Sequence, residues 1–171
     1  MRRMRSDAEA LLIGSTAIRM WFPDFRRPKD IDIYAMGGYD KKFMAVNRPK
    51  KTMVRTGRKL VVISGNNVVD IIMHTNGSHI PDIIKYCRDG GVEVTICKMK
   101  LILASPMALR MIKDIVSRFP KKQKEHKADL EFLKKKVPRR YTHHERQIVD
   151  KGVRHLKLFF DGRNDNIFDN Q

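Results

Sequence analysis

Two acidic residues are spaced in a way that suits a metal site. Asp30 and Asp32 alternate with Ile31 and Ile33 in the segment Asp30–Ala35, so in a β-strand both carboxylates would leave the same face. Neighbouring carboxylates repel each other unless a cation lies between them. Oxygen-only ligands favour Mg²⁺ or Mn²⁺. The spacing therefore predicts a divalent-metal site on this strand.

Asp70 is a third acid, and it stands alone in an apolar segment. It interrupts the run Val68–Met73, whose other members are Val, Ile and Met. A carboxylate buried there without a partner would cost several kcal/mol. A metal site shared with Asp30 and Asp32 would supply the partner. We therefore predict that Asp30, Asp32 and Asp70 meet around a divalent cation.

Gly14 and Ser15 end an apolar segment and precede a predicted short helix. Glycine lets the backbone approach a phosphate closely, and the free N–H groups at a helix start attract anions. The pair thus predicts a phosphate-binding turn. Each motif also has a simpler interpretation: a plain turn for Gly14-Ser15, and an exposed edge strand for the two acids.

The surrounding residues predict an α/β half followed by a helical half. Apolar runs and alternation predict strands over 8–13, 30–35, 60–63, 68–73 and 92–97, with a hairpin turn over 64–67 and short helices over 16–22 and 80–86. After residue 97 the pattern becomes helical, with helices over 106–119 and 121–136 and a third starting at the capping box of Thr142 and Glu145. We therefore expect an α/β core, 1–100, and a helical part, 101–171, packed as one unit.

The charge of the chain is strongly positive. Its 171 residues include 36 Lys+Arg and 19 Asp+Glu, a net charge of +17, which favours polyanionic partners such as nucleic acid or nucleotides. A solvated basic surface is the alternative. Residues 41–59 hold eight Lys/Arg and no acid, and we expect a flexible basic loop or a surface helix there.

Other features of the sequence argue for a soluble cytoplasmic protein. Cys87 and Cys97 form no Cys-x-x-Cys pair and no zinc spacing, so we expect two free thiols. No apolar run approaches the roughly 20 residues of a membrane span. The sequence leaves the oligomeric state open.

The motifs resemble the signature of the polymerase-β-like nucleotidyltransferase superfamily. That signature is a hydrophobic strand, Gly-Gly or Gly-Ser, a short helix and an acid-hydrophobic-acid strand. Here Leu12–Ser15, fourteen residues, and then Asp30–Ile33 match it. Asp70 matches the family's third acid in type and order. Residues 14–19 are also similar to abortive-infection nucleotidyltransferase toxins and related minimal transferases.

The resemblance implies an α+β fold, in which a small mixed β-sheet core is flanked by helices and followed by a helical half. It implies transfer of a nucleoside monophosphate from an NTP, with Mg²⁺ or Mn²⁺ as cofactor. Gly14 and Ser15 would hold the triphosphate, Asp30 and Asp32 would bind metal, and Asp70 would help to activate the acceptor. Lys113 or Lys127 would neutralise phosphate charge. Arg19 is a lesser nucleotide-binding candidate, because a structural ion pair would explain it equally well.

The sequence is compatible with several acceptors and with more than one activity. The charge makes RNA, tRNA especially, or DNA the preferred acceptor, with a protein hydroxyl or an antibiotic-like small molecule as alternatives. A non-catalytic nucleic-acid-binding protein on the same fold is a second hypothesis. A toxin or antidefence factor acting through a protein partner is a third.

Overall fold

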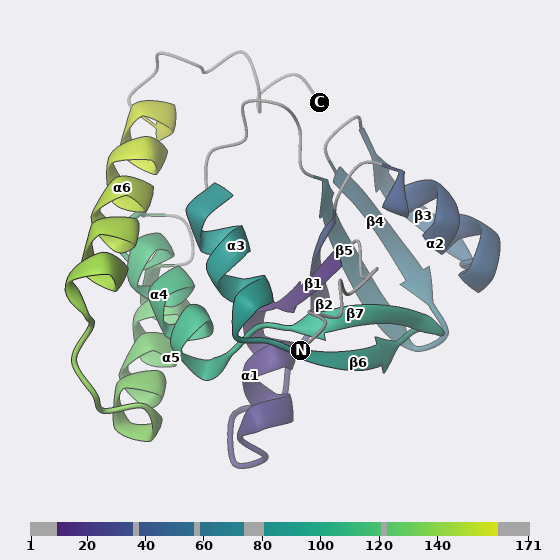
Figure 1. Ribbon diagram of the computed structural model, residues 1–171. Helices are drawn as coiled ribbons and strands as arrows, with labels where there is room; N and C mark the ends of the chain where they lie inside the picture. Colours follow the sequence, from purple (N-terminus) through teal and green to yellow (C-terminus); the bar gives the residue numbers. More distant parts are fainter. Residues whose placement is uncertain (1–9, 36–37, 57–58, 74–80, 121–122, 161–171) are drawn as a thin grey trace, which may run out of the picture. The chain divides into compact units, whose positions relative to one another are not determined.

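The computed structural model describes residues 10–35, 38–56, 59–73, 81–120 and 123–160 (Figure 1). The chain divides into two compact units. The first consists of Met1–Ser78 and Lys85–Leu109, and the second of His79–Ile84 and Arg110–Gln171. No helix in the described ranges is long and apolar enough to cross a membrane.

A mixed seven-stranded sheet dominates the first unit and confirms the predicted α+β class. The strands lie in the order β3-β4-β5-β2-β1-β7-β6. β2 is parallel to β5 and β1 is parallel to β7, whereas the other neighbours are antiparallel. Their bounds are β1 Ala10–Ile13, β2 Asp30–Ala35, β3 Lys51–Arg55, β4 Lys59–Ser64, β5 Asn67–Met73, β6 Val92–Ile96 and β7 Met99–Leu103.

The two faces of this sheet differ because side chains alternate along each strand. One face forms the core, and its fully buried side chains include Leu12, Ile33, Leu60, Val62, Val69 and Ile71. The opposite face of β2, β4 and β5 is only partly buried. We call it the open face, and its side chains are those of Asp30, Asp32, Tyr34, Lys59, Val61, Ile63, Val68, Asp70 and Ile72. The three predicted metal ligands therefore all belong to the less buried face.

Helix α1 (Gly14–Trp21) connects β1 to β2. It buries Ile18, and the Trp21 indole N–H donates a hydrogen bond of 2.9 Å to the carbonyl oxygen of Ala104. A buried indole usually finds such a partner. The bond fixes the end of α1 to the chain that leaves β7.

Helix α2 (Tyr39–Asn47) follows β2. It buries Tyr39 and Phe43, whose ring centroids lie 6.4 Å apart. These two aromatic side chains explain why a helix whose other residues are exposed or only partly buried packs stably here, since aromatic burial contributes more than intrinsic propensity.

The described part of the second unit is helical. Helices α3 (Pro81–Asp89) and α4 (Pro106–Val116) cross the boundary between the units, and α5 (Gln123–Lys136) and α6 (His143–Phe160) lie within the second. A Cβ added to Gly152 of α6 would lie 2.6 Å from Cδ1 of Ile115 in α4. Glycine at this position therefore permits the close packing of the two helices.

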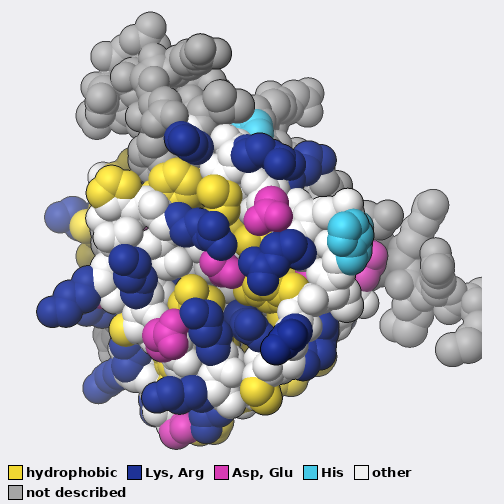
Figure 2. Space-filling view, turned by 90° about the vertical axis from the view of Figure 1, so that its left-hand side faces the viewer, with side chains coloured by type: hydrophobic (Ala, Val, Ile, Leu, Met, Phe, Trp, Pro, Cys, Tyr) yellow, Lys and Arg dark blue, Asp and Glu magenta, His cyan; other side chains and the backbone are white. Residues whose placement is uncertain are grey.

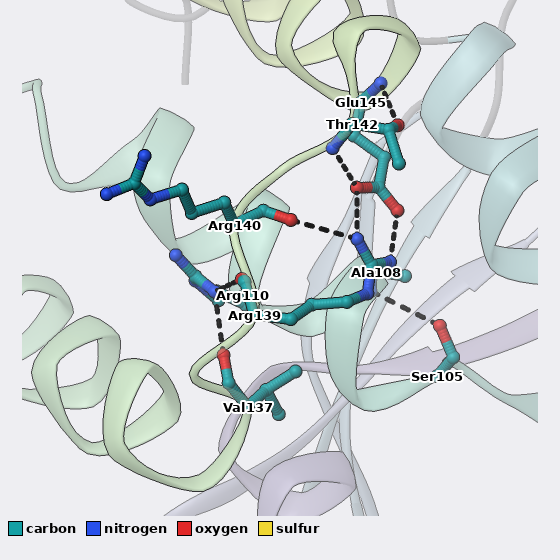
Figure 3. A network of polar contacts seen from close by, with 8 residues as sticks. All are labelled: Ser105, Ala108, Arg110, Val137, Arg139, Arg140, Thr142 and Glu145. Carbon is teal, nitrogen blue, oxygen red and sulfur yellow. Dashed lines mark hydrogen bonds and ion pairs between the residues drawn. The ribbon is translucent and has the colours of Figure 1, made fainter.

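The start of α6 is the predicted capping box (Figure 3). The Thr142 N–H donates to Oε2 of Glu145 at 2.8 Å, and the Glu145 N–H donates to Oγ1 of Thr142 at 3.2 Å. The Arg139 guanidinium donates two further bonds to the same carboxylate, at 2.8 and 2.6 Å. This network satisfies backbone groups at the helix start, so the prediction is confirmed.

The prediction for residues 41–59 was wrong. The described part of this segment is neither a loop nor a single surface helix, because it contains most of α2 and the whole of strand β3. β3 pairs with β4 at the edge of the sheet. The strand was not predicted because its Lys and Arg residues replace the apolar alternation that normally indicates a strand. Cations of this kind are common on edge strands, where they discourage pairing with another chain.

Strand β7 was also missed, because residues after 97 were expected to be helical. β6 and β7 form a hairpin whose turn residues Cys97 and Lys98 have positive φ angles of 48° and 59°. Such turns normally show Gly or Asn, so the sequence carried no hairpin signal.

The predicted N-cap Ser105 is confirmed, since its Oγ accepts a bond from the Ala108 N–H at 3.2 Å.

Candidate active site

Asp32 and Asp70 lie side by side on the open face. The parallel strands β2 and β5 have a register that pairs these two residues. Neighbouring strands lie about 4.8 Å apart, and paired side chains project from the same face, so the two carboxylates share one site. Asp30 projects from this face two residues earlier on β2 and pairs with Val68.

Gly14 abuts the carboxylate of Asp32. Its φ angle is +70°, and an added Cβ would lie 2.0 Å from Oδ2 and 2.8 Å from Cγ of Asp32. Any L side chain would therefore be strained and would overlap the carboxylate. α1 begins at Gly14, and its N-cap residue Ile13 makes no side-chain hydrogen bond to the first N–H groups. These N–H groups are thus available to an anion beside the carboxylates.

Ser15 and Arg26 meet at the start of α1. Ser15 is 7% exposed, and its Oγ accepts a hydrogen bond of 2.8 Å from Nη2 of Arg26. The Arg26 guanidinium also lies 5.3 Å from the ring centroid of Phe25. An Arg at this position offers several donors to a phosphate. Only the fold reveals it, because the loop after α1 returns the side chain to the helix start.

Hydrogen bonds hold the connection between α1 and β2 in place. Oγ1 of Thr16 donates to the carbonyl oxygen of Asp30 at 2.6 Å, which ties the start of α1 to the start of β2. The Arg19 guanidinium donates to the carbonyl oxygen of Phe25. Arg19 therefore braces the connecting loop, and its nucleotide-binding role stays a prediction.

The two oxygens of Asp70 have different surroundings. Oδ2 lies 2.9 Å from Nζ of Lys59, which is on the neighbouring strand β4. Oδ1 is buried and has no hydrogen-bond partner among the described residues. A bare buried carboxylate oxygen is unfavourable, and a hard divalent cation is a partner that would satisfy it. The Oδ1 side of Asp70 therefore fits the predicted metal.

The described side chains do not by themselves form a complete metal cluster. Within the described ranges, no three His, Cys, Asp or Glu side chains come together in a way that would hold a metal ion. The metal roles of Asp30, Asp32 and Asp70 therefore stay predictions, supported by the paired carboxylates and by the bare oxygen of Asp70.

Lys113 and Lys127 belong to the second unit. Nζ of Lys113 lies 2.8 Å from Oδ2 of Asp129 and 3.3 Å from Nδ1 of His126, and the Lys113 and Asp129 side chains are only 7% and 1% exposed. Lys113 thus has a structural partner within its own unit. Lys127 is exposed on α5. Their predicted contacts with nucleotide phosphates stay predictions.

The position of Lys59 beside Asp70 could have been predicted from the hairpin turn in the sequence. A two-residue hairpin fixes the register of its strands, and the turn between Ser64 and Asn67 places Val61 opposite Asp70. Lys59 then lies two residues along on the same face, within reach of the Asp70 carboxylate.

Comparison with solved structures shows the fold. The crystal structure of ANT(2″)-Ia in complex with adenylyl-2″-tobramycin matches with a TM-score of 0.53 and 13% identity, over 88% of each chain. The solution structure of the antibiotic-resistance factor ANT(2″)-Ia matches with a TM-score of 0.51 and 12% identity, over 89% of this chain and 83% of that one. No curated protein matches the sequence.

The resemblance inferred from the motifs is therefore confirmed at the level of the fold, which is that of polymerase-β-like nucleotidyltransferases. A family model described as "Domain of unknown function (DUF7277)" matches residues 10–170. This chain belongs to that family.

Proposed function

We propose that this protein is a metal-dependent nucleotidyltransferase that transfers a nucleoside monophosphate from an NTP to a hydroxyl group. The observation that carries the proposal is the carboxylate pair of Asp32 and Asp70, held side by side next to Gly14. The fold supports it, and one structure of this fold is a complex with adenylyl-2″-tobramycin.

The residues around the pair have chemically distinct roles in the proposed reaction. The N–H groups of Gly14 and Ser15, with the Arg26 guanidinium, would bind the triphosphate. Asp30, Asp32 and the bare Oδ1 of Asp70 would hold Mg²⁺, which neutralises phosphate charge and activates the attacking hydroxyl when bound. Asp70 would accept the proton of that hydroxyl. The hydroxyl oxygen bonds to the α-phosphorus, the bond from this phosphorus to the bridging oxygen breaks, and pyrophosphate leaves.

The net charge of +17 favours a polyanionic acceptor. Lys and Arg side chains spread over the face shown in Figure 2, where acidic side chains are few. A polycationic small molecule would be repelled by this field, whereas RNA, tRNA especially, or DNA would be attracted. We therefore propose nucleic acid as the acceptor.

A labelling experiment tests the activity. The protein is incubated with Mg²⁺, total RNA and each of the four α-labelled NTPs in turn, and the labelled polymer is identified. Asp32→Asn and Asp70→Asn should slow label transfer at least about a hundredfold, since even indirect support of a metal site is worth about 10–100-fold. Asp40→Asn in the first turn of α2 makes the same charge change away from the pair and should leave the rate unchanged. Undiminished transfer by Asp32→Asn would refute the assignment.

The Lys59–Asp70 ion pair favours a second candidate, a nucleic-acid-binding protein without catalysis. An ammonium group already neutralises the third acid at 2.9 Å, so a protein of this kind needs no metal there. This candidate predicts salt-sensitive binding that is independent of Mg²⁺ and survives Asp32→Asn. The same labelling experiment separates the two candidates, because only the enzyme transfers label.

A further inference from the structure

We propose that the open face beside β3 binds single-stranded RNA and leads its hydroxyl groups to Asp70. The inference rests on the proposed nucleotidyl transfer, because it names the acceptor and the surface that receives it. We call this surface the acceptor face. It consists of the side chains of Lys51, Val54, Lys59, Val61, Ile63 and Ile72.

The edge strand β3 extends the open face outward. Lys51 pairs with Ile63 and Val54 pairs with Val61, although the register shifts between Thr52 and Val54. Paired residues on neighbouring strands project from the same face. Lys51 and Val54 therefore lie on the face that carries the acids, despite the irregularity between them.

The acceptor face continues without a break to the proposed catalytic residues. Val61 pairs with Asp70 across β4 and β5, and Asp70 pairs with Asp32 across β5 and β2. Nζ of Lys59 touches Asp70 at 2.9 Å. A strand of nucleic acid lying across β3, β4 and β5 would thus bring its sugars to the carboxylates.

This face combines exposed cations with exposed apolar side chains. All five residues of β3 are exposed. Val54 is 40% exposed and Ile72 is 38% exposed. Proteins bind single strands by combining cations that contact the phosphates with side chains, mostly aromatic, that contact the faces of the bases. The acceptor face offers the cations, and in our proposal its exposed aliphatic side chains contact the bases in place of aromatic rings.

The charge of this part of the chain is one-sided. Residues 41–59 contain eight Lys/Arg and no acid, and Lys51 and Lys59 are the two that the register assigns to the open face. Contacts between these cations and phosphates would release counterions and so favour binding. An acidic peptide could pair with the cations, but it carries no bases that could contact the apolar side chains of this face.

Single-stranded RNA fits better than other nucleic acids. In a duplex the bases are stacked and paired, so the apolar side chains could not reach their faces. RNA carries a 2′-hydroxyl on every sugar and therefore presents a hydroxyl wherever the strand passes Asp70. DNA offers hydroxyls only at its ends. The acceptor face, with carboxylates at its inner border, suits the strand that has a hydroxyl at each step.

Fluorescence anisotropy with an end-labelled single-stranded RNA of about 12 nucleotides, without Mg²⁺ or NTP, tests the surface. The variant K51Q/K59Q should bind at least about tenfold more weakly at 0.1 M salt. In a plot of log affinity against log salt concentration, the slope for this variant should be smaller in magnitude by about 1.4, which is about 0.7 for each lost phosphate contact. An unchanged affinity and slope would overturn the proposal.

The matched control is K41Q/R55Q, which loses the same charge elsewhere in the same basic segment. Lys41 is exposed on α2, and Arg55 pairs with Leu60, whose side chain belongs to the buried face. This control should bind within about twofold of the unchanged protein. Equal losses in both variants would mean a general charge effect and would overturn the acceptor face. If K51Q/K59Q does not fold by circular dichroism, K51E alone must show weakened binding.

Two further arms identify the ligand and separate the two proposals. Single-stranded DNA should bind more weakly, and equal affinity for DNA would overturn the assignment to RNA. Asp32→Asn should keep full RNA binding while losing label transfer. If the unchanged protein transfers no label but the binding pattern holds, the acceptor face stands and the enzyme does not. If label transfer depends on Asp32 but K51Q/K59Q binds RNA normally, the enzyme stands and the acceptor face does not.

Discussion

The side chain that Gly14 lacks would collide with the carboxylate of Asp32. An added Cβ would lie 2.0 Å from Oδ2, and the φ angle of +70° belongs to the left-handed region. The start of α1 can approach the acid this closely only because residue 14 has no side chain. The glycine-led turn and the acidic strand, which are separate motifs in the sequence, therefore form one site.

Gly14→Ala should disturb this site beyond its effect on the backbone. We expect a loss of stability greater than the roughly 1–2 kcal/mol that the left-handed conformation alone costs a non-glycine residue, together with loss of label transfer. Gly65→Ala is the control, because Gly65 has a φ angle of +62° but nothing within 4 Å of an added Cβ. Chemical denaturation of both variants measures the difference, and equal destabilisation would contradict the predicted collision.

Lys59→Met should strengthen the binding of a divalent cation. The ammonium group lies 2.9 Å from Oδ2 of Asp70, so it competes with any cation that binds this carboxylate. Its removal should tighten Mn²⁺ binding roughly thirtyfold, because one unit charge at about 4 Å is worth about 1 kcal/mol even in water and a divalent ion feels about twice that. Titration followed by electron paramagnetic resonance measures the affinity. Lys51→Met is the control, and weaker Mn²⁺ binding by Lys59→Met would show that Lys59 supports the metal instead.

The buried pair of Lys113 and Asp129 should dominate the stability of the second unit. Removing one partner leaves the other buried charge without a counterion, which typically lowers the free energy of unfolding by about 3–5 kcal/mol. We expect a loss of this size for Lys113→Met and for Asp129→Asn, measured by urea denaturation. The double variant should lose less than the sum of the two. Additive losses, or a loss below about 1 kcal/mol for Lys113→Met, would show that the pair is not energetically coupled.

The two thiols should differ in reactivity. Burial raises the pKa of Cys87 from 9.0 to about 12, so almost no thiolate forms near neutral pH. Cys97 lies in the turn between β6 and β7 and is less buried, although burial raises its pKa as well. At pH 8, iodoacetamide should modify Cys97 first and Cys87 only after unfolding. Peptide mass spectrometry measures both rates, and equal rates in the native protein would contradict the burial of Cys87.

The same thiol should make stability depend on alkaline pH. Because the folded state raises the pKa of Cys87, the contribution of the protonated thiol is complete below about pH 9 and is lost as the pH rises towards 12. The melting temperature of Cys87→Ala should therefore fall less steeply over this range than that of the unchanged protein. Cys97→Ala is the control, and identical slopes for Cys87→Ala and the unchanged protein would refute the assignment.

The sequence by itself determined the features that depend on near neighbours in the chain. The alternation of acids with isoleucines predicted the strand Asp30–Ala35 with its correct bounds, because side chains on a strand alternate between faces. Thr142 and Glu145 predicted the start of α6, since a capping box needs only four residues. Gly14 marked the end of β1, although α1 begins at Gly14 itself and not at the predicted residue 16. Local geometry was enough in each case.

Only the tertiary structure decided which of these local features meet. The pairing of Asp32 with Asp70 depends on β5 lying beside β2, and the insertion of β7 between β1 and β6 left no local signal. The ion pair of Lys113 with Asp129 is another contact that the sequence did not reveal, and the predicted phosphate contact of Lys113 stays a prediction. Strand order and side-chain burial arise from contacts between residues far apart in the chain, and local propensities do not specify such contacts.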